Sequence, residues 1–468
     1  MKYSLDDTIA GIATALGEAG IGIIRISGPQ ARSILRRLFR PAGQSGPWEP
    51  ESHRLTYGHV VDPESRATVD EVMAVWMQAP RTYTRQDVVE IQSHGGATVL
   101  RAMLTLVLAA GARLAEPGEM TLRAFLNGRL DLAQAEAVLD VVRARTEAGL
   151  QTAQAQLGGA LSHEIRQARA ALLEVLAHLS ALIDFPEDEV PPQLIRPQLD
   201  EAERLLQGLL RTADRGILLR EGLRVAIVGR PNVGKSSLLN RLLRHERAIV
   251  TEIPGTTRDL VEESLSIRGV PVVLADTAGI RDTSDVVEAL GVARSRAALE
   301  QADLVLLVLD AGQPLTDEDC ALAAIVGGRP AIVVWNKLDL LGGDGEQADT
   351  LSVPLPGVVP EAPRVAVSAR TGAGIEALEA RVWELVMGGQ VVATTGREAL
   401  VSNPRHKAAI RTALNNVQAA RSGLDEGLPA DFLTIDLTAA VNALGEITGE
   451  TATEDLLDVI FSRFCIGK

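Results

Sequence analysis

The stretch Gly229-Arg-Pro-Asn-Val-Gly-Lys-Ser236 follows an apolar run, Leu223–Val228, and precedes a segment of helical composition. A glycine-rich loop between a strand and a helix is typical of a phosphate-binding P-loop. Its glycines allow backbone N–H groups to close around phosphates, and the helix adds the positive end of its dipole. We expect Lys235 to reach the β and γ phosphates and the Ser236 hydroxyl to bind Mg²⁺. The alternative is a simple glycine-rich turn, since this motif alone arises by chance in on the order of one chain in a hundred.

Three further motifs follow in order, each at the end of an apolar run. Asp276-Thr277-Ala278-Gly279 offers a carboxylate to Mg²⁺ through water and a backbone N–H to the γ-phosphate. Asn336-Lys337-Leu338-Asp339 offers a carboxylate to guanine N1–H and the 2-amino group, donors that adenine lacks, so it favours GTP over ATP. Ser368-Ala369-Arg370 offers a backbone N–H to guanine O6. Together the four motifs resemble those of translation-factor-related GTPases, and a coincidence of all four is negligible.

Switch I is expected over Thr251–Asp259, where it would order around the γ-phosphate, and its predicted nucleotide contacts are Thr251, Glu252, Ile253, Pro254, Gly255, Thr256 and Thr257. Thr257 is the predicted second Mg²⁺ ligand. Ras-like enzymes carry a water-orienting Gln shortly after the glycine of the second motif, but Ile280 stands there and is apolar. Either hydrolysis is slow or another group acts. Glu288 is the candidate, although its spacing by itself favours an exposed glutamate on a helix. The remaining predicted nucleotide contacts belong to the P-loop: Asn232, Val233, Gly234, Lys235, Ser236 and Ser237.

Composition limits the class of protein. The 468 residues predict two to four domains, and the net charge of −15 argues against attraction of nucleic acid by the whole surface. Two cysteines exclude a disulfide scaffold and suit a reducing cytosol. Neither a signal peptide nor an apolar run long enough to span a membrane is evident, so a cytoplasmic location is expected.

The pattern along the chain changes three times. Residues 1–118 alternate short β-branched runs with helical stretches and are predicted to be an α/β domain. Residues 119–217 are rich in Ala, Leu, Gln and Glu at helical spacing, and single helices are expected over Leu130–Gly149 and Ala160–Leu182. Residues 218–388 predict a doubly wound, mostly parallel sheet. Residues 389–468 return to helices, expected over Pro404–Ser422 and Ala430–Ser462. The predicted fold class is therefore a P-loop domain inserted in a helical domain, preceded by an α/β domain.

The whole chain resembles the bacterial and organellar tRNA-modification GTPases of the MnmE (TrmE) family. The resemblance extends beyond the nucleotide motifs to segments at both ends of the chain. These are Asp7–Ala10, Gly22–Gly28, Glu90–Gly96, Pro117–Glu119, Ala124–Ala137 and Phe464–Lys468. The last two are quite specific to the family.

The resemblance implies a potassium-dependent reaction. A K⁺ ion beside the phosphates would take the place of an arginine finger, with Asn232, Thr251, Ile253 and Thr256 at the matching ligand positions. A fixed cation next to developing charge stabilises a transition state without proton transfer. Dimerisation of the G domains would order switch I around this ion. Glu288 matches the family's catalytic glutamate, acting through a bridging water, and Lys235 is the second predicted catalytic residue.

The same resemblance implies a homodimer with a folate site in the N-terminal domain. Arg25, Glu90, Arg129 and Lys468 match the positions that contact a tetrahydrofolate derivative of the 5,10-methylene or 5-formyl type. A carboxylate can pair with the aminopyrimidine edge, and cations can hold the glutamate tail. Without the resemblance, Arg25 reads as a surface residue on an edge strand. Cys465 lies near this site in the family, and a catalytic thiol and an inert cysteine remain equal alternatives.

The sequence is compatible with two functions. The first is a GTPase that supports (carboxymethyl)aminomethyl-type modification at C5 of the wobble uridine, U34, of certain tRNAs. It would act with a flavin-dependent subunit, MnmG, which carries the FAD and much of the tRNA surface. The alternative is a ribosome-assembly or signalling switch that binds RNA or protein. Relatives of that kind carry a KH-type RNA module or a second G domain, and this sequence has one P-loop and predicted helices at its end.

Overall fold

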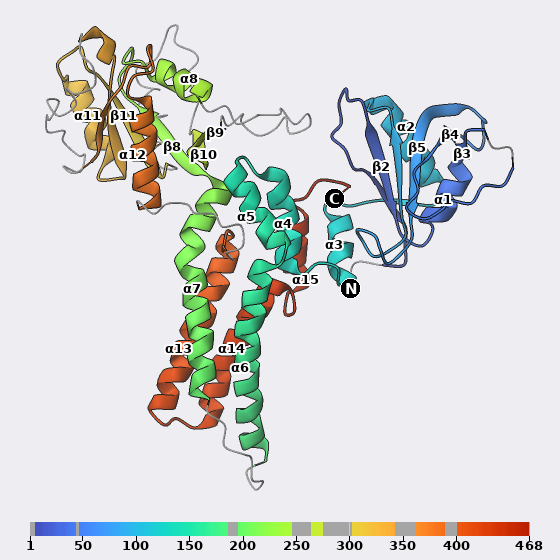
Figure 1. Ribbon diagram of the computed structural model, residues 1–468. Coiled ribbons are helices and arrows are strands. Elements are labelled where there is room, and N and C mark those ends of the chain that lie inside the picture. Colours follow the sequence, from blue (N-terminus) through green and yellow to red (C-terminus); the bar gives the residue numbers. More distant parts are fainter. Residues whose placement is uncertain are drawn as a thin grey trace.

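The computed structural model describes residues 5–43, 46–185, 195–245, 264–274, 299, 302–341, 362–388 and 400–467. Figure 1 shows an N-terminal α/β unit and a second α/β unit, both attached near one end of a bundle of long helices. The predicted fold class is confirmed. Among the described residues, no helix is long and apolar enough to cross a membrane.

The N-terminal unit contains a seven-stranded sheet in the order β3-β4-β5-β6-β2-β1-β7. Its strands are β1 (Ile9–Ile12), β2 (Gly22–Ser27), β3 (Phe39–Pro41), β4 (Thr56–Val61), β5 (Thr68–Met77), β6 (Val88–Ser93) and β7 (Arg113–Leu114). Side chains alternate between its two faces. Ile24 and Ile26 point to the face that packs against α1 (Ala31–Leu38) and α2 (Ala97–Ala109). Arg25 and Glu90 alternate with these core residues, so they lie on the opposite, half-buried face.

A buried ion-pair network joins this unit to the first helix that follows it, α3 (Glu119–Leu126). The Arg123 guanidinium is 1% exposed and pairs with Glu119 at 3.0 Å and with Asp7 at 2.5 Å. Arg113 also binds Glu119, at 2.6 Å. Burial raises the pKa of Glu119, but hydrogen bonds from Arg113, the Glu116 N–H and Arg123 outweigh it, so the pKa is lowered. Asp7 and Glu119 thus anchor α3 to the N-terminal sheet.

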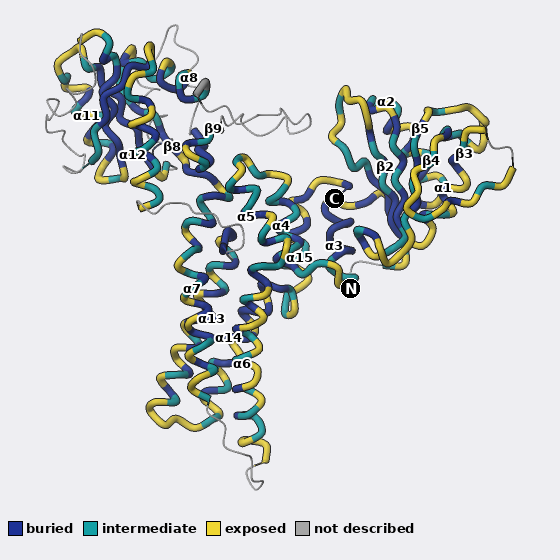
Figure 2. The backbone as a smooth tube through the Cα atoms, viewed as in Figure 1, coloured by how far each residue is buried: buried dark blue, intermediate teal, exposed yellow. Residues whose placement is uncertain are grey.

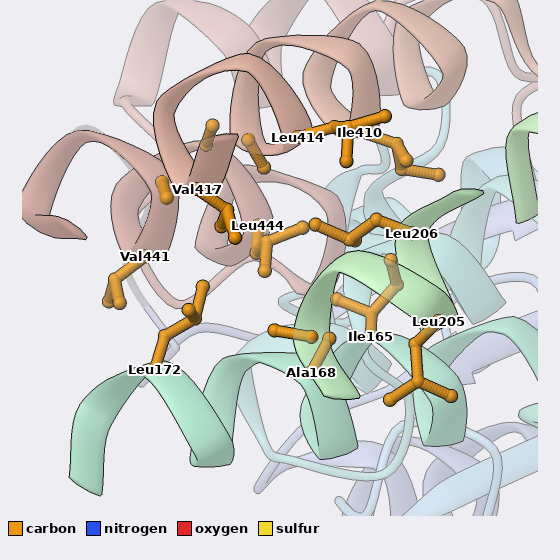
Figure 3. Close-up of a cluster of buried hydrophobic side chains, with 14 of the residues drawn as sticks. Ile165, Ala168, Leu172, Leu205, Leu206, Ile410, Leu414, Val417, Val441 and Leu444 are labelled. Carbon is orange, nitrogen blue, oxygen red and sulfur yellow. The ribbon is translucent and has the colours of Figure 1, made fainter. Parts of the chain in front are cut away.

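Four long helices form the bundle: α6 (Ala160–Asp184), α7 (Arg196–Glu221), α13 (Pro404–Asp425) and α14 (Ala430–Thr448). Figure 3 shows the side chains of Leu172, Leu206, Leu414 and Leu444 meeting in its core. Buried residues line the inner sides of these helices and exposed residues the outer sides (Figure 2). Because α6 and α7 precede the second α/β unit and α13 and α14 follow it, that unit is an insertion between two halves of one core.

Two of the helices predicted as continuous are broken in the structure. The expected helix Leu130–Gly149 is α4 (Leu132–Arg143) followed by α5 (Glu147–Leu157), because the Thr146 hydroxyl caps a new helix by accepting from the Gly149 N–H. The expected helix Ala430–Ser462 ends as α14 at Thr448, where Gly449 adopts a left-handed φ of 92°. A second helix, α15 (Glu454–Phe461), begins at the Thr453 cap. Both breaks come from local caps that helical periodicity does not register.

The inserted unit contains a six-stranded sheet in the order β13-β12-β11-β8-β10-β9, parallel except for the hairpin of β9 and β10. Its strands are β8 (Leu223–Val228), β9 (Ser264–Ile267), β10 (Val270–Leu274), β11 (Leu304–Asp310), β12 (Ala331–Asn336) and β13 (Arg364–Ala366). The helices of this unit include α8 (Lys235–His245), α11 (Asp317–Val326) and α12 (Ile375–Met387). Every residue of β11 and β12 is buried, as the apolar runs predict. Helix α7 passes into β8 at Gly222, so bundle and sheet are directly connected.

Candidate active site

The P-loop connects β8 to α8 at the carboxyl end of the sheet. A Cβ at Gly229 would lie 2.3 Å from the Val308 carbonyl oxygen, and one at Gly234 would lie 2.2 Å from Asn336 Nδ2. Gly234 also has a φ of 98°, which side chains other than glycine rarely adopt. The loop therefore approaches its neighbouring strands so closely that both glycines are required. Asn232 is exposed at the tip of the loop, with a left-handed φ of 63°.

The Lys235 ammonium folds back across the loop. Its Nζ donates to the carbonyl oxygens of Gly229 at 2.7 Å and Arg230 at 2.8 Å. Burial lowers the pKa of Lys235. The positive charge is thus held against the loop whose N–H groups are predicted to enclose phosphates. Ser236 follows at half-buried depth in the first turn of α8.

A pocket of about 520 Å³ lies beside the P-loop, over the ends of β12 and β13. The lining joins three of the predicted motifs. It consists of Gly234, Ser237, Asn240, Arg241, Asn336, Lys337, Asp339, Leu340, Ala369 and Arg370. Residues predicted to bind phosphate and residues predicted to bind the base, more than 100 positions apart in the sequence, therefore line one space.

Asn336 holds the two sides of the pocket together. Its side chain is buried, with Nδ2 donating to the Val233 carbonyl at 2.9 Å and Oδ1 accepting from the Ala369 N–H at 3.0 Å. Lys337 has a left-handed φ of 67° and its ammonium binds Asp310 at 2.8 Å. The motif therefore acts first as a structural clamp, and of the backbone N–H groups in the Ser368-Ala369-Arg370 motif, that of Ala369 is engaged by Asn336.

The Asp339 carboxylate is oriented by two neighbours from the last motif. Ser368 Oγ donates to it at 2.6 Å, and Arg370 Nε lies 3.0 Å from its other oxygen. The Ser368 hydrogen bond lowers the pKa of Asp339, so the carboxylate stays ionised and can accept from a base. These side-chain roles of Ser368 and Arg370 were missed by the sequence reasoning, which assigned this motif only a backbone donor.

Several predicted residues lie outside the described part of the chain. They are the switch I positions Thr251, Glu252, Ile253, Pro254, Gly255, Thr256 and Thr257; the motif Asp276, Thr277, Ala278 and Gly279; Glu288; and Lys468. The described pocket therefore contains residues of the P-loop and of the two motifs predicted to bind guanine.

A second cluster forms on the open face of the N-terminal sheet. Arg25 on β2 and Glu90 on β6 are directly opposite in register, and Arg25 Nε donates to Glu90 Oε1 at 2.8 Å. Arg25 also donates to the Gly467 carbonyl at 3.2 Å, so the end of the chain reaches this site. The edge-strand interpretation of Arg25 is wrong, because β2 lies between β6 and β1 inside the sheet.

Tyr83 connects this pair to a third predicted residue. The Arg129 guanidinium lies 4.7 Å from the Tyr83 ring centroid and donates to the Tyr83 carbonyl at 3.0 Å, while Arg25 lies 6.0 Å from the same ring. Burial raises the pKa of Tyr83, whose hydroxyl contacts Thr121 at 2.9 Å. The sequence reasoning did not single out Tyr83, because an isolated tyrosine in a loop carries no motif.

Cys465 lies close to the same cluster along the chain. Its side chain is exposed and unpaired with another cysteine, and its carbonyl accepts from the Gly118 N–H at 3.3 Å. The thiol is accessible, which distinguishes it from a cysteine packed in a core.

Comparison with known proteins gives the family. The sequence pattern of the MnmE helical domain matches residues 132–465, and that of the GTP-binding protein TrmE N-terminus matches residues 8–129. The tRNA modification GTPase MnmE of Chloroflexus aurantiacus is 55% identical over 467 residues, 99% of this chain and 100% of that protein. MnmE of Roseiflexus sp. strain RS-1 is 51% identical over 465 residues, 99% of each chain. A solved structure, the G domain of the T. maritima FeoB iron transporter, is 26% identical and covers 35% of this chain and 98% of that one, with a TM-score of 0.25. On its full-length similarity to these relatives, the chain belongs to the MnmE family of tRNA modification GTPases.

Proposed function

We propose that this chain, a tRNA modification GTPase by family, uses GTP hydrolysis to support modification at C5 of the wobble uridine of certain tRNAs. The product is an aminomethyl or carboxymethylaminomethyl group, with ammonium or glycine as the amine source. The observation that carries the proposal is the presence of two built sites in one chain. One is the guanine pocket of Asn336 and Asp339, and the other is the cluster of Arg25, Glu90 and Arg129.

The pocket supports GTP rather than ATP. The Asp339 carboxylate faces a space of about 520 Å³ and is kept ionised by Ser368, so it can accept two hydrogen bonds from guanine. Lys235 lies across the P-loop, where phosphate oxygens would replace the carbonyls that it now contacts. Ser236 and Thr257 would hold Mg²⁺, which neutralises the phosphate charge.

The exposed position of Asn232 suits a K⁺ ligand at the edge of the phosphate site. With Thr251, Ile253 and Thr256 it would hold the ion, which adds fixed positive charge beside the γ-phosphate. Glu288 would orient the attacking water, because Ile280 has no polar group.

The N-terminal cluster fits the two ends of a folate. Glu90 presents a carboxylate, half-buried at 19% exposure, that can pair with an aminopyrimidine edge. Arg25, which is paired with Glu90, would lie with it at the pterin end next to the flat Tyr83 ring, and Arg129 and Lys468 would supply cations for the glutamate tail. A bound methylene- or formyl-tetrahydrofolate would supply the one-carbon unit. Cys465, exposed next to this cluster, is available as a thiol for that step.

Two further partners follow from this assignment. A homodimer through the N-terminal unit is in keeping with a sheet that α1 and α2 cover on one face and whose other face leaves Arg25, Glu90 and Gln92 half-buried. A flavin-dependent MnmG-type subunit would carry FAD. It would also provide much of the tRNA surface, in keeping with the net charge of −15 here.

The test is mass spectrometry of tRNA nucleosides from cells that lack the protein and are complemented with variants. Wild type is expected to restore the C5-aminomethyl modifications. Glu90→Gln is expected to leave GTP hydrolysis intact but restore little modification. Unchanged wobble nucleosides in the deletion strain would instead favour the alternative, a ribosome-assembly or signalling switch.

A further inference from the structure

A second cleft, of about 430 Å³, lies where α4, α5 and α7 meet the start of α13. It is separate from both sites described above. Four arginines line it: Arg143 from α4, Arg220 from α7, Arg405 from α13 and Arg463 from the segment after α15. Asp140 and Glu221 are the lining carboxylates.

Two of these arginines are neutralised within the protein. Arg220 Nε binds Asp140 at 2.8 Å, and Arg405 binds the buried carboxylate of Glu136 at 2.7 Å. Both pairs join α4 to other helices of the bundle, so they account for the architecture of the cleft wall.

The other two arginines have no such role. The Arg143 guanidinium donates to the Arg463 carbonyl at 3.0 Å, and both side chains are exposed at the rim. Within the described residues, no carboxylate forms an ion pair with either of them. Glu221, the remaining lining carboxylate, is exposed and likewise forms no ion pair in the described chain. The rim therefore presents two positive charges that no carboxylate of the described chain neutralises.

The backbone adds to this positive potential. The 11-residue helix α5 begins at Glu147, just after the Thr146 cap, and Gly149 of its first turn lines the cleft. The Gly149 N–H is bonded to the Thr146 hydroxyl, so this turn contributes the partial positive charge of a helix N-terminus, which Glu147 in the same turn reduces. Guanidinium forks and a helix N-terminus are both groups that recognise phosphate oxygens.

The cleft lies close to the N-terminal cluster along the chain. Arg463 is four residues from Gly467, whose carbonyl accepts from Arg25 in the N-terminal cluster of Arg25, Glu90 and Arg129. Four residues span at most about 14 Å, so the rim lies within a few nucleotides' reach of that cluster. Because the chain carries a net charge of −15, contact with RNA must be made through local basic sites such as this one.

We propose that Arg143 and Arg463 bind a phosphate of the tRNA backbone and so hold the substrate beside the N-terminal one-carbon site, an inference that rests on the proposed function. The group bound by the two arginines is the phosphodiester of an RNA backbone. A free phosphate anion offers the same oxygen atoms and is the alternative ligand. Base sequence plays no part in this contact, because phosphate contacts position a nucleic acid without reading it.

The experiment measures tRNA binding to the full-length chain as a function of salt, for wild type, Arg143→Ala/Arg463→Ala and Arg143→Lys/Arg463→Lys. The alanine variant is expected to bind tRNA about tenfold more weakly, with the slope of log K against log salt reduced by about one. The lysine variant is expected to retain the slope. GTP hydrolysis is expected to stay at the wild-type rate in both. Arg411→Ala is the matched control, an exposed arginine on α13 that forms no ion pair in the described chain.

Each other outcome has a distinct meaning. An alanine variant that binds tRNA with the same affinity and slope as Arg411→Ala would overturn the assignment of this cleft alone. Wild type that fails to bind any tRNA would overturn the proposed function together with it. A third outcome separates the two phosphate sources. If inorganic phosphate raises the Tm of wild type but not of the alanine variant, and both bind tRNA equally, the cleft is a site for a free anion. That result would also overturn the proposal.

Discussion

The side-chain amide of Asn336 donates to the Val233 carbonyl at 2.9 Å, although 103 residues separate them in the chain. One residue of the base-binding motif therefore fixes the shape of the phosphate-binding loop. Through Ala369, the same side chain fixes the last motif as well. The guanine and phosphate halves of the site are consequently a single hydrogen-bonded unit before any nucleotide arrives.

Asn336→Ala is expected to destabilise the G domain itself. The change leaves the Val233 carbonyl and the Ala369 N–H buried without their partner, which costs about 2 to 4 kcal/mol in total. Urea unfolding of the nucleotide-free protein measures this loss, and GTP affinity should fall with it. Asn240→Ala is the control, an exposed residue in the lining of the same pocket. A variant that loses GTP affinity at unchanged stability would contradict the clamp role.

Asp339→Asn is expected to change which base is bound. The Asp339 carboxylate can accept from both guanine N1–H and the guanine 2-amino group, and an asparagine amide cannot accept from both. Xanthine has a carbonyl in place of the 2-amino group, and that carbonyl can accept from the asparagine N–H. GDP affinity should fall by about 10³-fold or more, and xanthosine diphosphate should bind better than GDP. Titration with fluorescent analogues of both nucleotides checks the result. Retained preference for GDP would show that Asp339 does not read the base.

Hydrolysis is expected to depend on the monovalent cation. If K⁺ occupies the site at Asn232, replacing KCl by NaCl at equal ionic strength should slow GTP turnover by about 10²-fold or more, because a fixed charge beside the phosphates is removed. GTP affinity should change little. Phosphate release assays in the two salts measure the effect, and equal rates would exclude the cation site.

Glu288→Ala is expected to separate binding from turnover. Loss of the group that orients water should lower kcat by about 10²-fold or more and leave GTP affinity near the wild-type value. Glu318→Ala is a suitable comparison, because this glutamate lies near Lys235 on α11 and has no assigned role in orienting water. If Glu288→Ala hydrolyses GTP at the wild-type rate, Glu288 has no part in orienting the attacking water.

The bundle is expected to lose stability in acid through Glu136. Burial raises the pKa of this carboxyl, but the charge and hydrogen bond of His406 and those of Arg405 outweigh it and lower the pKa from 4.5 to about 2. A carboxylate with a depressed folded-state pKa stabilises fully above its unfolded pKa, and the effect is lost as the pH falls from 4.5 towards 2.

Glu136→Gln should therefore lower stability at neutral pH by about 3 kcal/mol and flatten the acid limb of the stability curve. Urea unfolding at several pH values between about 2 and 7 tests this. Glu201→Gln is the matched control, since Glu201 forms an exposed pair with Arg204 on α7 and should contribute little. An acid limb that is identical in wild type and Glu136→Gln would rule out the buried network as its source.

Much of the fold was predictable because its signals are local. Strand β8 and helix α8 were expected from an apolar run, a glycine-rich loop and helical composition that adjoin in the chain. The breaks at Thr146 and Gly449 were not, since a cap depends on one or two residues and does not disturb helical periodicity. Without the family resemblance, the residues around Arg25 indicate an edge strand, because nothing local reveals that β2 pairs with the distant segments β6 and β1.

The sequence by itself determined the family of this protein, and it predicts which loop encloses phosphate and which carboxylate prefers guanine. Such properties depend on residue types at fixed spacing along the chain. Only the tertiary structure decided that Asn336 clamps Val233, that Ser368 and Arg370 orient Asp339, and that Tyr83 joins Arg25 to Arg129. It also brought Arg143 to Arg463 across 320 residues of chain. These relationships arise from helix packing and strand order, which bury segments against one another without any matching signal in either segment.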